Sequence, residues 1–369
     1  MSVEIHKKII IILIILTVNN FNSNNKINIK NEFKNSNLKL NMFKNKFNDS
    51  PFIKSFLDKI NIISHYSSNS RKKNIINICM NINNKYIYPV LISMESALAN
   101  CNKKKSLLIY HILCPGDIKD NILLKIKSLM NHYPKNVELI YYNMSDIFIK
   151  FKHIHFSQTS YYRLITPIFI NLNRIIYLDG DTLILKDLNE MYQSSFDDNY
   201  ALGFLNIQSK DIDDLGIKSE KYINSGVLLL NLEKIRKDKK YYDLINFVSN
   251  QSQIYYDQKI LNFILYPFIG KLPYKFGMWN FKNKLEINQY SQKLRQKINI
   301  TELEEAYENP SLFHLVTCWP KPWISSSIYQ SCKNNNCRCL RFHQMWYYYA
   351  NKTDYYEEIF KFYKFKLLR

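Results

Sequence analysis

Two carboxylates separated by one residue follow an apolar stretch near the middle of the chain. Residues 175–178 are Ile-Ile-Tyr-Leu, and Asp179, Gly180 and Asp181 come directly after them. Because side chains alternate along a strand, Asp179 and Asp181 project to the same side. Two acids so close repel each other unless a cation lies between them, and hard divalent ions such as Mn²⁺ or Mg²⁺ take such oxygen ligands. The pair therefore predicts a metal site, although Asp and Gly after a strand are also ordinary turn formers.

The segments before this pair alternate between strand and helix patterns. Strand-like runs cover residues 75–82, 106–114, 137–142 and 174–178, and helical spacing covers 86–100, 118–132 and 160–170. This order predicts an α/β fold with a mostly parallel central sheet that helices cover on both faces. Ligands in such sheets bind beyond the carboxyl ends of the strands. The two acids are expected at that edge.

Composition limits the class of protein. The chain has 369 residues, 46% of them hydrophobic, which suits one large domain or two ordinary ones. It has only 7 glycines, and this scarcity disfavours the Gly-rich phosphate loops of P-loop NTPases and dinucleotide-binding folds. The net charge of +20 suits a polyanionic partner. However, the lysines are scattered along the sequence, which contains no nucleic-acid-binding motif, so we expect no nucleic-acid partner.

The N-terminal residues have the pattern of a targeting segment. Lys7 and Lys8 precede the apolar run 9–18, which is too short for a spanning helix of ~20 residues. Residues 1–18 are therefore predicted to be a signal peptide or a short signal-anchor. We accordingly expect the protein in the lumen of the secretory pathway (ER or Golgi), attached to the membrane if this segment is not cleaved. Residues 19–72, rich in Asn, Lys and Ser, are predicted to form a flexible stalk.

Further motifs follow the acidic pair in a fixed order. They are YLDGDTL at 177–183, YINSGVLLLNL at 222–232, YDQKILN at 256–262, His314 with Lys-Pro-Trp at 321–323, and WYYYANKT at 346–353. Together they resemble the family 8 glycosyltransferases. These are retaining nucleotide-sugar enzymes of GT-A fold, among them glycogenin and bacterial lipopolysaccharide galactosyl- and glucosyltransferases. The resemblance extends over roughly residues 73–355.

The resemblance implies a domain organisation and an activity. It implies a single GT-A domain at 73–330, followed by a short C-terminal helical tail at 331–369. It also implies a metal-dependent retaining glycosyltransferase that moves glucose or galactose from a UDP-sugar to a glycan, lipid or protein acceptor. In the tail, the spacing of Cys332, Cys337 and Cys339 predicts a local disulfide or free thiols, not a zinc ribbon. Its basic and aromatic end, 360–369, predicts either contact with an anionic membrane surface or a helix packed by its aromatic residues.

By the same resemblance, His314 is the third metal ligand beside Asp179 and Asp181. A mixed nitrogen and oxygen set suits Mn²⁺ better than Mg²⁺, which is the alternative ion. Lys321 is expected to place its charge on the diphosphate of the donor. The list of expected substrate contacts continues with Arg163, which resembles the family's donor-contacting Arg, and His155, at the position of a substrate-contacting His in some bacterial members.

A second group of residues is expected around the sugar. Asn224 and Ser225 precede an apolar strand, and the resemblance implies that they contact the substrate. It also implies that Asp257 binds sugar hydroxyls and that Gln258 lies under the anomeric carbon. An amide is a poor nucleophile. The resemblance therefore favours attack on the same face of the sugar within an ion pair, with the departing phosphate accepting the proton of the acceptor.

The sequence departs from the family pattern at two places. Between His314 and Lys321 there is one residue more than usual, and Thr317 replaces a glycine, so the diphosphate loop is expected to bulge. At the nucleotide end, Asn83 stands where the family has Asp. Tyr86 is expected to stack on the base and Asn83 to offer its amide oxygen to it, which suits uridine and leaves cytidine and guanosine donors open.

Two other classes of protein compete with this interpretation. The string Asp179-Gly180-Asp181-Thr182 is similar to the nucleophile motif of haloacid dehalogenase-type phosphatases, although its Thr comes one residue early. The altered loop and Asn83 also suit a non-catalytic, sugar-binding descendant of the transferases. Turnover of a phosphate ester in the first case, and donor binding without turnover in the second, would distinguish them.

Overall fold

The computed structural model describes most of the chain beyond residue 35. The described residues are 36–47, 51–66, 73–116, 120–144, 147, 158–206, 209–249, 256–277, 286–289, 299–316, 321–323 and 340–364. Within these ranges no helix has both the length and the apolar character that crossing a bilayer requires. Several predictions lie outside the described residues. They concern the targeting segment 1–18, His155, and the cysteines Cys332, Cys337 and Cys339.

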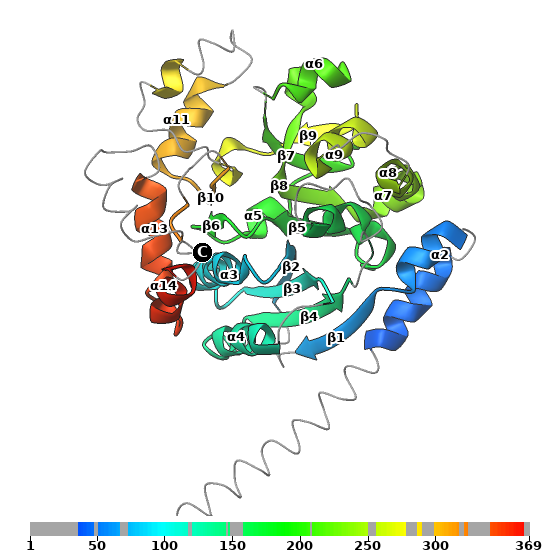
Figure 1. Cartoon of the computed structure of the whole chain (residues 1–369). Helices are drawn as coiled ribbons and strands as arrows, with labels where there is room; N and C mark the ends of the chain where they lie inside the picture. Colours follow the sequence, from blue (N-terminus) through cyan, green and yellow to red (C-terminus); the bar gives the residue numbers. More distant parts are fainter. Residues whose placement is uncertain are drawn as a thin grey trace, which may run out of the picture.

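A mixed sheet of eight strands runs through the centre of the fold in the order β1-β4-β3-β2-β5-β8-β7-β9 (Figure 1). The strands are β1 (Asn61–Tyr66), β2 (Asn74–Asn81), β3 (Ser106–Cys114), β4 (Val137–Asn143), β5 (Arg174–Leu178), β7 (Ala201–Leu205), β8 (Ile223–Asn231) and β9 (Ile269–Lys271). Strands β4, β3, β2 and β5 are parallel neighbours, as predicted. β8 runs antiparallel to both β5 and β7, β1 runs antiparallel to β4, and β9 is parallel to β7. Two short strands, β6 (Thr182–Ile184) and β10 (Leu312–His314), form a separate antiparallel pair.

Helices cover both faces of the large sheet (Figure 1). One face carries α3 (Ile87–Asn100), α4 (Asp120–Asn131), α13 (Leu340–Ala350) and α14 (Tyr356–Lys364). The other carries the 3₁₀ helix η2 (Gln158–Ile168) and helices α7 (Leu232–Lys237), α8 (Lys240–Ser249) and α9 (Asp257–Leu265). Further helical elements are η1 (Asn45–Phe47), α2 (Pro51–Leu57), α5 (Asn189–Tyr192), α6 (Asp211–Leu215), η3 (Ser219–Lys221), η4 (Tyr274–Phe276) and α11 (Ile300–Glu308), and residues 36–44 and 286–289 are also helical.

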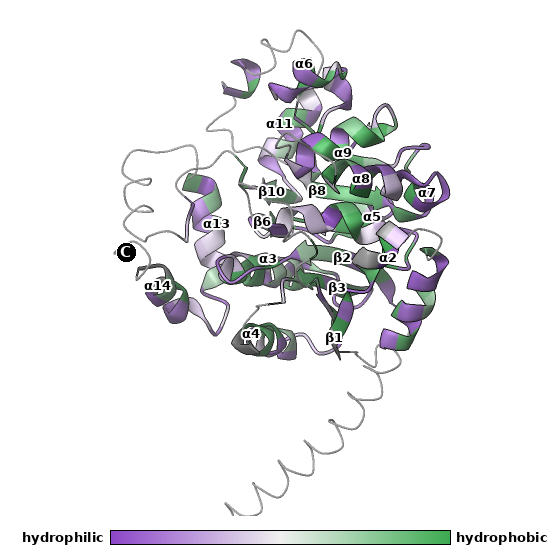
Figure 2. Ribbon diagram, turned by 45° about the vertical axis from the view of Figure 1, so that its right-hand side comes forward, coloured by the Kyte–Doolittle hydropathy of each residue, from purple (hydrophilic) through white to green (hydrophobic). Residues whose placement is uncertain are grey.

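Strand β5 explains why the segment before the acids is apolar throughout. Ile176 and Leu178 are buried in the hydrophobic core that includes α3, while Ile175 and Tyr177 are buried in the core that includes η2. A strand buried on both faces needs apolar side chains at every position. The hydrophobic residues of the ribbon in Figure 2 accordingly follow the central strands. The apolar run ends where the sheet ends, and the first acid comes next.

The C-terminal helices pack on the domain. Phe342 and Trp346 of α13 are buried in the same core as α3. The ring of Phe362 in α14 forms an edge-to-face contact with the ring of Tyr88 in α3, with centroids 5.0 Å apart. Lys125 of α4 forms an ion pair with Glu358 of α14. The predicted helical tail therefore completes one face of the sheet with its described residues.

The predicted stalk is folded over part of its length, which corrects our expectation for 19–72. Residues 36–44 and 51–57 are helical, and β1 pairs with β4. Apolar side chains that the Asn-rich composition obscured are buried there: Leu40, Phe43, Ile53, Leu57, Ile60 and Ile62. The Asn37 side chain exchanges hydrogen bonds with the backbone N–H and C=O of Ile62, at 3.0 and 2.8 Å. Through β1 the segment adds a strand beside β4, whose backbone groups on that side would otherwise be unpaired.

Candidate active site

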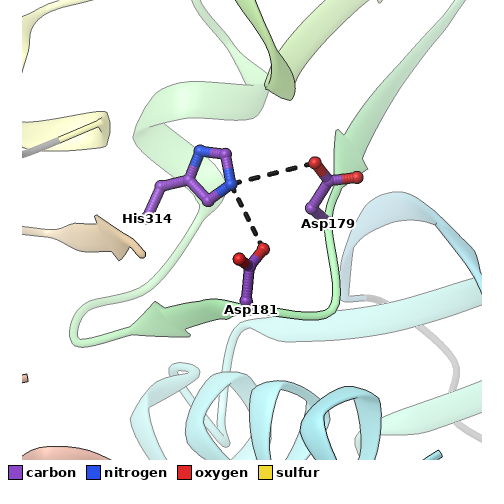
Figure 3. Close-up of side chains that lie close together, drawn as sticks. All are labelled: Asp179, Asp181 and His314. Carbon is purple, nitrogen blue, oxygen red and sulfur yellow. Dashed lines mark ion pairs between the residues drawn. The ribbon is translucent and has the colours of Figure 1, made fainter. Parts of the chain in front are cut away.

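Strand pairing brings the three predicted metal ligands to one point. Asp179 follows the last residue of β5, and Asp181 precedes the first residue of β6. β10 pairs with β6 so that His314 lies opposite Thr182. His314 Nε2 is therefore 3.2 Å from Asp181 Oδ1 and 3.8 Å from Asp179 Oδ2 (Figure 3). The remote imidazole and the two neighbouring acids meet, as the resemblance implied.

The chemistry of this cluster fits a divalent cation. One ligand atom from each of the three side chains lies within 4.8 Å of the other two. One imidazole nitrogen and two carboxylate oxygens are ligand atoms that divalent metal ions take in proteins. Gly226 on β8 leaves room for the side chains of His314 and Asp179, because a Cβ there would lie 2.2 Å from His314 Cε1 and 2.4 Å from Asp179 Oδ2. Any side chain at this position would displace a ligand.

Arg163 of η2 links Asp179, one of the three candidate metal ligands, to a second acid, Asp257. Its Nη2 donates to Asp179 Oδ1 at 2.9 Å, and its Nε lies 3.3 Å from Asp257 Oδ2. The same side chain donates to the backbone carbonyls of Ser160 and Ser225. Burial opposes its charge, but the two acids raise the pKa of Arg163 above its usual range. Arg163 is thus a permanent buried cation in the wall of the site, and its expected contact with the donor stays a prediction.

Lys321 lies beside Asp181 of the candidate metal site, although the loop before it is one residue longer than usual in the family. Its Nζ donates to Asp181 Oδ2 at 2.8 Å and also to the backbone carbonyl of Leu315. Burial favours the neutral form of Asp181, but His314 and Lys321 outweigh it and hold the pKa of Asp181 well below its usual range. The acid is therefore ionised at neutral pH. Loop residues 317–320 lie outside the described residues.

The four residues predicted around the sugar also lie together, where β8 meets the start of α9. Gln258 Oε1 accepts hydrogen bonds from Asn224 Nδ2 at 3.1 Å and from Ser225 N at 3.2 Å. Ser225 Oγ donates to Asp257 Oδ2 at 2.9 Å. Burial raises the pKa of Asp257, and Asp179 adds to this shift, while Arg163 opposes it. These side chains form a hydrogen-bonded group that Arg163 links to Asp179.

Asn83 and Tyr86, the residues predicted to contact the base of the nucleotide, lie directly before α3. The ring of Tyr86 is 42% exposed and meets the edge of Trp323 at a centroid distance of 6.0 Å. Burial and, after it, the charges of Asp181 and Asp179 raise the pKa of Tyr86. Asn83 Oδ1 accepts hydrogen bonds from the backbone N–H groups of Lys85 and Tyr86, at 2.9 and 3.0 Å. The oxygen that we expect to meet the base is engaged in this turn, so the role of Asn83 in base recognition stays a prediction.

Sequence reasoning missed one residue of the site. Tyr177 donates its hydroxyl hydrogen to Asp179 Oδ1 at 2.9 Å. The signal was present, since a residue two positions before Asp179 on a strand projects to the same side. We took Tyr177 only as part of the apolar run.

The structure combines an α/β fold with three candidate metal ligands beyond a central strand, Asp179, Asp181 and His314. The chain belongs to Glycosyl transferase family 8, whose sequence profile matches residues 77–327. It is therefore a glycosyltransferase, related to hexosyltransferases. This family membership also decides against the phosphatase interpretation of Asp179–Thr182.

The chain is also similar in sequence to curated proteins and in fold to solved structures. The chain is 25% identical over 275 residues to General stress protein A of Bacillus subtilis, covering 70% of this chain and 90% of that protein. It is 26% identical over 272 residues to a lipopolysaccharide 1,2-glucosyltransferase of Escherichia coli, covering 70% and 76%. Its fold resembles the bifunctional glycosyltransferase WbbM (TM-score 0.61, 16% identity, 80% of this chain and 53% of WbbM). It also resembles the galactosyltransferase LgtC in complex with donor and acceptor sugar analogues (TM-score 0.53, 19% identity, 67% and 89%).

Proposed function

We propose that this glycosyltransferase is metal-dependent and retaining, and that it moves glucose or galactose from a UDP-sugar to a glycan, lipid or protein acceptor. The observation that carries the proposal is the convergence of Asp179, Asp181 and His314 within 4.8 Å. A Mn²⁺ ion held by these three side chains would neutralise charge on the leaving diphosphate. Mg²⁺ is the alternative ion, and the relatives that act on glucose or galactose support a hexose as the transferred sugar.

The protein's own residues have distinct tasks in the proposed reaction. Lys321, whose Nζ lies 2.8 Å from Asp181 Oδ2, would add a positive charge near the diphosphate. Asp257 would bind sugar hydroxyls, with Asn224 as a further substrate contact. In the reaction, the bond between the anomeric carbon and the phosphate oxygen breaks, the acceptor oxygen bonds to that carbon, and the acceptor proton passes to the departing phosphate.

The hydrogen bonds of Gln258 support attack on the same face over double displacement. An amide oxygen has two lone pairs, and Gln258 Oε1 accepts from two N–H groups, those of Asn224 and Ser225. Neither lone pair is free to attack carbon, and an amide is a weak nucleophile. Gln258 is better suited to position Asn224 and Ser225 under the sugar.

A donor screen tests the proposal. The full chain is incubated with UDP-, GDP- and CDP-hexoses, with and without Mn²⁺, and released nucleotide is measured. We expect release from UDP-glucose or UDP-galactose that requires Mn²⁺, and a product that retains the anomeric configuration of the donor by NMR. Binding of a UDP-sugar without turnover, with or without Mn²⁺ and over a range of acceptors, would favour the non-catalytic descendant.

The cellular setting is a proposal of its own. The basic residues and apolar run of 1–18 favour entry into the secretory pathway. Fusion of residues 1–35 to a reporter protein tests it, because only a targeting segment would bring the reporter into the lumen. Flotation of the full chain with anionic vesicles, compared with a chain that ends at residue 359, tests the expected membrane contact of the C-terminal end.

A further inference from the structure

Both metal-facing acids are held through the oxygen that points away from His314. On Asp179, Oδ2 faces His314 Nε2, and Oδ1 accepts from both Arg163 Nη2 and the Tyr177 hydroxyl, each at 2.9 Å. On Asp181, Oδ1 faces the imidazole and Oδ2 accepts from Lys321. In each carboxylate one oxygen is anchored and the other is presented to the same point.

We propose that Tyr177 is a positioning residue for the metal: its hydroxyl fixes the orientation of Asp179, so that Oδ2 is presented to the ion together with His314 and Asp181. This inference rests on the proposed metal site. It assigns to Tyr177 an effect on metal affinity, through Asp179, without contact with the ion or the substrate.

The direction of the hydrogen bond follows from the chemistry of its partners. An ionised carboxylate has only acceptors, so the phenol must donate. Groups that hydrogen-bond a metal ligand fix its orientation, and their loss commonly weakens metal affinity 10–100-fold. Tyr177 is 1% exposed and lies on β5, which ends one residue before Asp179. The donor therefore comes from a rigid part of the sheet.

Arg163 alone would hold Asp179 less well. Its guanidinium stacks on the ring of Tyr177, with its central carbon 4.2 Å from the ring centroid. Arg163 also has to bind Asp257 and the carbonyl of Ser225. With one donor on Oδ1 the carboxylate can turn about the remaining hydrogen bond, whereas two donors from different elements, β5 and η2, restrict this rotation. The Tyr177 ring thus supports Arg163, and its hydroxyl supplies the second donor.

The test is Tyr177→Phe in the full chain, with Mn²⁺ alone as the probe. This variant keeps the ring and its stacking and removes one oxygen. The matched control is Tyr141→Phe, because Tyr141 is equally buried in the same sheet and its hydroxyl has no hydrogen-bond partner among the described residues. Mn²⁺ binding is measured by titration calorimetry without nucleotide. We expect the Mn²⁺ Kd of Tyr177→Phe to rise about tenfold or more and that of Tyr141→Phe to stay at the wild-type value.

A kinetic readout separates positioning from damage to the fold. If Tyr177 acts on the metal, Tyr177→Phe needs more Mn²⁺ for half-maximal activity, but kcat at saturating Mn²⁺ returns close to that of the wild type. A kcat that no Mn²⁺ concentration restores, or a Mn²⁺ Kd within twofold of wild type, would overturn the inference. The variant Asp181→Asn distinguishes failure of the proposed metal site from failure of the proposed role of Tyr177. If Asp181→Asn binds Mn²⁺ as wild type does, the metal site itself is wrong, whereas if it loses Mn²⁺ while Tyr177→Phe does not, only the role of Tyr177 fails.

Discussion

Replacement of Gly226 by alanine should abolish activity at a modest cost in stability. The new methyl group would lie 2.2 Å from His314 Cε1 and 2.4 Å from Asp179 Oδ2. Ordinary contacts are near 3.5 Å, so the imidazole and the carboxylate must together give way by about 1 Å. Metal–ligand distances tolerate only about 0.2 Å, and a misplacement of about 1 Å can lower a rate by about 100-fold. Overpacking costs about 1–3 kcal/mol of folding free energy, which a domain of this size can survive.

Gly216 provides a matched control for this experiment. It has a φ of +63° and nothing lies within 4 Å of its added Cβ, so Gly216→Ala strains the backbone without touching the site. That strain costs about 1–2 kcal/mol. The assay is donor hydrolysis with Mn²⁺, together with thermal unfolding of both variants. We expect similar losses of stability and a loss of at least 100-fold in rate for Gly226→Ala alone. Near-normal activity of Gly226→Ala, or equal loss in both variants, would refute the packing argument.

Two further predictions concern single carboxylates. Asp181→Asn removes a ligand charge, so Mn²⁺ binding and turnover should fall by at least about 100-fold while circular dichroism stays unchanged, and normal turnover would show that the site is misassigned. Glu95 in α3 is buried, and burial raises its pKa from 4.5 more than the hydroxyl of Tyr133 lowers it. The folded state therefore holds the Glu95 proton more tightly than the unfolded state does. The resulting contribution to the free energy of unfolding is present below pH 4.5 and is lost as the pH rises through the folded-state pKa. Glu95→Gln should therefore melt a few degrees above wild type at about pH 8, with a smaller difference at about pH 5, and a pH-independent difference would contradict this.

The central strands could be predicted from sequence because each carries its own local signal. The apolar run of β5 and its terminal acids are adjacent in the chain, and a strand buried on both faces must be apolar throughout. The place of His314 has no such local signal. It depends on the pairing of β10 with β6, which joins segments far apart in sequence, and only the resemblance to a family indicated it.

The parts that sequence reasoning missed follow from the same distinction. Residues 36–66 are Asn-rich, and composition alone predicted a stalk. The isolated side chains of Leu40, Ile53 and Ile62 are nevertheless buried, and β1 of this segment pairs with β4. Arg163 was predicted as a site residue, but its partners in the structure could not be predicted from sequence. The resemblance implied only a contact with the donor, and the tertiary structure shows that the Arg163 side chain also donates to Asp179 and to backbone carbonyls and lies beside Asp257.

The charges of the site indicate that the metal and the donor should bind together. Three carboxylates, those of Asp179, Asp181 and Asp257, lie against two basic side chains, Arg163 and Lys321. Both basic side chains are thus already paired with acids of the site, and a diphosphate is itself an anion. A divalent ion would add two positive charges, so UDP should bind at least about tenfold more tightly with Mn²⁺, which corresponds to about 1.4 kcal/mol. The measurement is calorimetric titration of UDP with and without Mn²⁺, at low ionic strength where screening is weak. Equal affinities would mean that Arg163 and Lys321 suffice to attract the diphosphate, and the electrostatic role proposed for the ion would then be wrong.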